Sequence, residues 1–274
     1  MKHLTICLLS LFSTMLLAQR KPKIKGNRMV TEVREVLPPF NAIELKDNLD
    51  VVLKKSFGPG YEVKADDNLV DILKFDVQDS TLIISSFYTV TSKKEFDIAV
   101  NFTELRAITI HAGSVDSEAI ISSDELFIDV FGDAELNLEA SAHSMNLNLE
   151  GSSTGDFNLD VDSLNISAKS RVKALVYAVS GSQKIELRGN ASLDLEGTTD
   201  LLVADLTGST KLKGQTMEAA SIELKLEEST NAHIYAYRDL ELTSKGNAKT
   251  YLYGNPNISV LEFLDASQLI KKEE

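Results

Sequence analysis

Residues 145–153 read MNLNLEGSS, and residues 202–210 read LVADLTGST. In both stretches apolar side chains occupy every second position and lead into a Gly-Ser pair. Strict alternation is typical of a β-strand with one buried face. Glycine allows a positive φ where a chain turns sharply. Each stretch therefore predicts a half-buried strand that ends in a tight corner.

The same unit recurs through residues 104–257, with copies about 19 residues apart. A second alternating set of apolar residues follows most corners, as at Leu136 and Leu138. A repeat this short, without helical periodicity, predicts an all-β fold: a parallel β-helix (solenoid) of about eight two-strand coils. The aligned corner positions are Ala112, Gly132, Gly151, Ser170, Gly189, Gly208, Glu228 and Gly246.

The segments on either side lack the repeat. Residues 19–103 still carry strand signals, and we expect them to form an N-terminal β cap that is continuous with the coils. Residues 258–274 are expected to close the other end as a C-terminal cap and tail, so that 19–274 form one continuous domain. The strand signals of the first segment lie at residues 41–45, 49–53, 61–63, 75–77, 81–84 and 96–100.

Residues 1–18 have the layout of a secretory signal peptide. A cationic start at Lys2 precedes an apolar run from Leu4 to Leu17, and Ala18 is the expected cleavage position. The run is about 14 residues long, whereas a membrane-spanning helix needs about 20. The alternative is an N-terminal membrane anchor or a buried helix. Cleavage predicts an exported protein without a membrane span, in the periplasm, at the outer-membrane surface or outside the cell.

Composition excludes several classes of protein. The chain has 41 acidic against 28 basic residues and a formal net charge of −13, which argues against binding to nucleic acid or to anionic lipid. Its only cysteine, Cys7, lies inside the expected signal peptide, which excludes a disulfide scaffold and a cysteine-rich zinc module. We expect no cofactor.

Several motifs, taken in order, resemble a known family, the auto-transporter adhesin head GIN domain, which is frequent in exported proteins of Bacteroidota. The resemblance covers residues 33–260 and implies a right-handed β-helix, an envelope or extracellular location and no catalytic motif to transfer. Ser170 and Glu228 depart from it where a corner glycine is expected. The motifs are FNAIEL at 40–45, LDVVL at 49–53, VKADDNL at 63–69, VQDSTLII at 77–84 and YGNP at 253–256.

The chain carries no recognisable catalytic or metal-binding motif such as HExxH, GxSxG or CxxC. His111 and His233 belong to the first and seventh coils, too far apart to share a metal ion. Acidic residues do gather at outward positions of the second strand. They could serve a polysaccharide-degrading enzyme, but a solvated acidic face is the favoured interpretation. These residues are Glu135, Glu139, Asp156, Asp160, Asp194 and Glu196.

Tyrosines form the one candidate binding surface. Tyr177, Tyr235 and Tyr253 are expected to share an outward column, with His233 and Tyr251 in the adjacent column and Tyr237 just beyond. Exposed aromatic rings could stack on sugars or anchor a protein partner. The alternative is that tyrosine simply suits an exposed strand.

Three functional hypotheses follow. The favoured one is an exported, non-catalytic envelope or surface protein that binds a glycan or a surface protein as an adhesion module. The second is a structural or stress-related envelope module without a small ligand, and the third is a polysaccharide-degrading enzyme. None of the three hypotheses specifies an oligomeric state.

Overall fold

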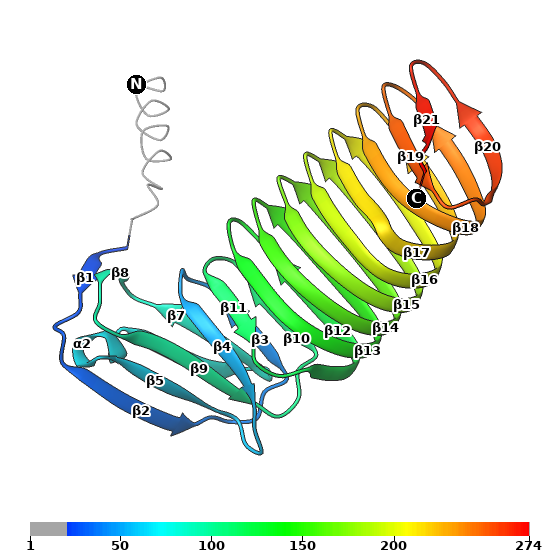
Figure 1. Ribbon diagram of the computed structural model, residues 1–274. Helices are drawn as coiled ribbons and strands as arrows, with labels where there is room; N and C mark the ends of the chain where they lie inside the picture. The colour runs from blue at the N-terminus through cyan, green and yellow to red at the C-terminus, as the bar shows by residue number, and fades with distance from the viewer. Residues whose placement is uncertain (1–20, 274) are drawn as a thin grey trace, which may run out of the picture.

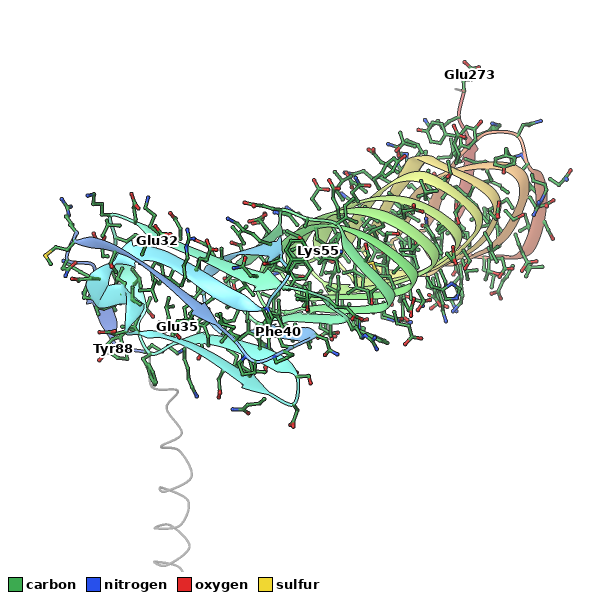
Figure 2. All side chains as sticks on the ribbon, turned by 90° about the horizontal axis from the view of Figure 1, so that it is seen from below. Glu32, Glu35, Phe40, Lys55, Tyr88 and Glu273 are labelled. Carbon is green, nitrogen blue, oxygen red and sulfur yellow. The ribbon has the colours of Figure 1, made fainter. Side chains whose placement is uncertain are left out.

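The computed structural model describes residues 21–273 of the chain; the signal peptide expected at residues 1–18 lies outside them. The described chain forms a β-solenoid of about nine turns, which confirms the predicted parallel β-helix with one turn more than expected. Figure 1 shows the turns stacked into a rod. In Figure 2, Glu32 and Tyr88 lie toward one end of the rod and Glu273 at the other.

Long parallel strands build the middle of the rod. From β13 to β16 each strand pairs with the next in one constant register, so that Leu147, Ile166 and Ile185 lie in a single column. Each long strand consists of the second strand of one coil followed directly by the first strand of the next coil. At the bend between these two parts, one residue, such as His143, is not part of the strand pairing. The strands are β12 (Ile121–Val130), β13 (Glu135–Gly151), β14 (Thr154–Ser170), β15 (Lys173–Gly189), β16 (Ser192–Gly208), β17 (Lys211–Leu226) and β18 (Asn231–Ser244).

The inward side chains of these strands form one apolar core along the rod. Leu147 and Leu149 are fully buried, because the parallel register places the same apolar column of each turn directly on that of the next. Phe157 is the bulkiest buried side chain of these coils; a Cβ at Gly155 would lie only 2.6 Å from its ring. Burial of these columns supplies the main stabilisation of the rod.

Positive φ values mark the predicted corners. Gly151 has φ 84°, and the two substitutes Ser170 and Glu228 adopt φ 77° and 66°. The first corner falls one position later than expected: Gly113 has φ 88°, whereas Ala112 does not have a positive φ. The loop from β10 (Ala107–Ile110) to β11 (Ser114–Ser117) has one residue fewer than the loop from β12 to β13, with which those strands pair, so the two corners do not align residue by residue.

The solenoid extends into the N-terminal segment even though the repeat spacing is absent there. The strands β3 (Ala42–Leu45) and β4 (Asp50–Lys55) pair in parallel with β10 and β11 and so form an earlier turn. Two further strands, β7 (Thr81–Ser86) and β9 (Phe96–Phe102), continue the stack beyond them.

Antiparallel strands then cover this end of the rod. The strand β5 (Gly60–Asp66) pairs with β9 and with β2 (Val30–Val36), while β6 (Leu73–Gln78) pairs with β7. The short helix α2 (Asp67–Val70) buries Leu69, and β1 (Lys23–Lys25) pairs with β8 (Thr89–Ser92). The N-terminal end of the core is therefore closed.

At the other end, three short strands add a last turn. The strand β19 (Lys249–Tyr253) pairs with β18; β20 (Asn257–Phe263) also pairs with β18, and β21 (Gln268–Lys271) pairs with β19. Most of the segment expected to act as a C-terminal cap is thus itself another coil.

Candidate functional site

A stack of aromatic rings lies on the outer face of the last turns. His233 of β18 pairs with Tyr251 of β19, and their ring centroids are 4.3 Å apart with an interplanar angle of 18°. His233 also lies 6.3 Å from the ring of Tyr253. All three side chains are half-buried and point away from the core, since the residues between them along each strand are buried. Parallel pairing in register brings these rings together.

Two lysines supply positive charge near this stack. The Lys272 Nζ lies 5.2 Å from the centroid of the Tyr251 ring, within the range of a cation–π contact. Burial lowers the pKa of His233, and the nearby ammonium groups of Lys272 and Lys213 lower it further. The imidazole is therefore mostly uncharged at neutral pH, and the stack, which we call the aromatic ladder (His233, Tyr251 and Tyr253), is a largely neutral surface beside a cation.

Tyr235 and Tyr237 border the ladder differently. Tyr235 pairs with Tyr253, as the sequence predicts, and is half-buried. Tyr237 follows at the bend of β18, is 55% exposed and lines a small pocket of about 120 Å³ together with Thr198 and Glu218. Tyr237 thus faces a separate hollow.

Tyr177 does not share the column of Tyr235. It pairs with Asn158 and Glu196, and the strand β15 that carries it is three strand spacings, about 14 Å, from β18. The register shifts in β17, where Gly214 pairs with Ile234 but Glu218 pairs with the very next residue of β18, Tyr235. The residues of β17 between these two pairs leave the ladder, and this irregularity separates Tyr177 from the aromatic ladder.

Sequence reasoning missed the neighbours of Tyr177. Leu175 and Val179 of the same strand also point outward and are 38% and 41% exposed. The sequence does carry a signal for these two residues. In β15 the alternation of apolar and polar residues fails, and apolar residues occupy these outward positions. Lys272 was missed because it lies in a segment interpreted as a tail.

The expected acidic face is present and lines a shallow groove of about 720 Å³, which includes Glu135, Glu139 and Asp156. Two carboxylates of this groove share one polar partner: Asn137 Nδ2 donates to Asp116 at 2.8 Å and to Glu135 at 3.2 Å. Of the other predicted acidic residues, Asp194 pairs with Lys213 at 2.9 Å, Glu196 lies beside Tyr177, and Asp160 pairs with Val179 on β15.

Within residues 21–273 no group of three or more His, Cys, Asp or Glu side chains is placed to hold a metal ion. The other two histidines of this range, His111 and His143, each lie beside one acidic residue. His111 Nε2 lies 3.1 Å from Glu44, and His143 Nδ1 lies 2.6 Å from Asp162. The same residues contain no apolar helix of membrane-spanning length.

Comparison with known families gives a match over most of the chain. The family model described as "Putative auto-transporter adhesin, head GIN domain" matches residues 39–183 and 155–256. Comparison with curated proteins finds no match.

Solved structures share the fold. A protein of Parabacteroides distasonis described as a putative lipid binding protein has a TM-score of 0.66 at 18% identity, covering 92% of this chain and 100% of its own. A putative adhesin of Parabacteroides merdae gives the same values. A putative adhesin of Parabacteroides distasonis has a TM-score of 0.64 at 17% identity, covering 91% of this chain and 100% of its own. At such identities the likeness concerns the fold.

Proposed function

This chain belongs to the auto-transporter adhesin head GIN domain family, and we propose that it is an exported, non-catalytic protein of the cell envelope that binds carbohydrate through the aromatic ladder. Export follows from the signal peptide that the sequence predicts. Relatives described as adhesins support a role in attachment.

The observation that carries the proposal is the outward stack of His233 on Tyr251 with Lys272 beside it. Sugar rings present C–H faces that pack on aromatic rings, and their hydroxyl groups accept hydrogen bonds from an ammonium group. A neutral imidazole can stack without the cost of desolvating a charge. The ladder thus offers an apolar platform and a polar donor at one place.

Glycan-array binding by the purified chain tests this proposal. Changing both Tyr251 and Tyr253 to alanine is expected to weaken binding by about tenfold, the equivalent of one lost stacking contact of about 1.5 kcal/mol. Tyr177→Ala is the matched control, because Tyr177 is an exposed outward tyrosine of the coils that lies outside the ladder. It should bind like the unchanged chain.

The alternatives give different results. No binding to any glycan, or equal binding by the ladder variants, would contradict the proposal and favour a structural or stress-related envelope module. Turnover of a polysaccharide that is lost in Glu139→Gln and Asp156→Asn would instead favour an enzyme that uses the acidic groove.

A further inference from the structure

The C-terminal end of the rod exposes its core. Ile258 and Val260 of β20 lie in the columns of Leu240 and Leu242 of β18. The two leucines are 1% and 0% exposed, whereas Ile258 and Val260 are 47% and 48% exposed. The side chains are of the same kind and point the same way; what differs is that no further turn lies over β20 within residues 21–273.

The exposed apolar surface at this end is concentrated. Leu261, Phe263 and Leu264 are also exposed, at 63%, 43% and 49%, so that five large apolar side chains fall within residues 258–264. Terminal turns of solenoids usually carry polar residues that keep the end in water. At the opposite end of the rod, α2 and antiparallel strands cover the core. At the C-terminal end the last turn itself carries apolar residues, and no such cover is present within residues 21–273.

The backbone of the last turn is open as well. Among the described residues β20 pairs only with β18, and β21 pairs only with β19. Each therefore presents a row of N–H and C=O groups along the rod axis, which is the surface that adds another strand. An apolar end with open strand edges favours a partner that supplies strands.

Charge at this end is divided between its two sides. Glu262 pairs with Thr243 just before the corner that contains Asp265, while Lys271 pairs with Leu252 next to the opposite bend, followed by Lys272. A two-fold axis perpendicular to the rod and to its strands would lay the acidic side of one copy on the basic side of the other. The same operation sets β20 antiparallel to β20 of the second copy.

We propose that two copies of this protein associate tail to tail through β20 and β21, which would bury the exposed core of both rods in a continuous antiparallel sheet junction. Two faces about 10 Å apart, widened to about 20 Å by their outward side chains, and strands of about 23 Å give a footprint of about 500 Å² on each copy. The total of about 1,000 Å² reaches the lower limit of specific interfaces. The resulting dimer is symmetric and closed.

Molar-mass measurement by light scattering during gel filtration, over a range of concentrations, tests the proposal. The chain is expected to form a concentration-dependent dimer, and small-angle X-ray scattering is expected to show nearly twice the maximum dimension of the monomer. Val260→Lys and, separately, Leu261→Lys should give monomers, because each places a charge in the interface. Leu175→Lys, at an outward apolar residue on the side of the rod, is the control and should leave the dimer intact.

Charge reversal separates a specific dimer from general stickiness. Glu262→Lys and Lys271→Glu should each weaken the dimer, and the double variant should restore it. A monomer at every concentration would overturn the proposal, as would an association that both lysine variants at β20 leave unchanged. A dimer no longer than the monomer would overturn it too. Circular dichroism of each variant confirms that the coils are folded, and binding to glycans is scored separately.

Discussion

Single corner residues decide how tightly one turn lies on the next. Ser170 adopts φ 77°, a conformation that costs a residue with a side chain about 1–2 kcal/mol. At Gly151, one turn earlier, φ is 84° and an added Cβ would lie 2.5 Å from the carbonyl oxygen of Gly132. The two positions share a column but differ in the space they offer.

We therefore expect opposite effects from opposite substitutions. Ser170→Gly should raise the free energy of unfolding by about 0.5–1 kcal/mol, the relief of strain less the extra chain entropy of glycine. Gly151→Ser should lower it by about 2 kcal/mol or more, because strain and a backbone clash add. Urea denaturation of the two variants checks this. Equal effects of the same sign would show that the corners do not control the stacking.

At the scale of the strand, one inward position breaks the apolar column. Gln183 of β15 lies between Leu164 and Leu202 of the neighbouring turns and is 1% exposed. Its Nε2 donates to Ser180 Oγ at 2.9 Å, whereas its Oε1 has no partner among the described residues. A buried carbonyl oxygen without a donor costs free energy that an apolar side chain of similar volume would not.

Gln183→Leu is accordingly expected to raise the free energy of unfolding by about 1 kcal/mol, since it completes a column of apolar residues. The reverse change in the neighbouring turn, Leu164→Gln, is expected to lower it by about 1–3 kcal/mol. Thermal and urea unfolding measure both. A lower free energy of unfolding for Gln183→Leu would contradict this expectation. It would mean that the Gln183 amide stabilises the rod through the hydroxyl groups of Ser180 and Thr199, which line a pocket and are linked by a 3.1 Å hydrogen bond.

The strands also show what the sequence could and could not reveal. The regular spacing of the repeat was sufficient for β13 to β16, because every turn there has the same length and each inward column continues. It failed for the turn made by β3 and β4, where Leu45 pairs with Ile110 across the whole of the intervening cap sequence. Long insertions that form the cap hide that pairing from any periodic pattern.

The candidate site was predictable to the same extent. The pairs His233 with Tyr251 and Tyr235 with Tyr253 follow from the repeat spacing of the last coils, and both are present. The position of Tyr177 depends on the irregular β17, where local geometry and not residue count sets the register. The sequence did not predict that Lys272 lies beside the aromatic ladder. Its position depends on the last turn, and the residues that form that turn carry no corner glycine from which the turn could be recognised.

At the scale of the whole molecule, the two ends of one continuous core are unequal. The core runs as a single cluster from Phe40 to Leu252, closed by the cap at the N-terminal end and open at β20. In a solenoid each turn is stabilised mainly by its neighbours, so a turn with one neighbour opens more easily than a turn with two.

Hydrogen exchange followed by mass spectrometry should therefore show a gradient along the rod. Amides of β13 to β16 are expected to exchange most slowly, and those of β20 and β21 fastest in the monomeric variant Val260→Lys. In the unchanged chain, protection of β20 should increase with protein concentration, because tail-to-tail pairing supplies the missing neighbour. Protection of β2 and β5 should not depend on concentration, since the cap already covers that end. Equal exchange of β20 and β14 in the monomeric variant would show that the last turn is as stable as the middle of the rod, contrary to a nearest-neighbour account of its stability.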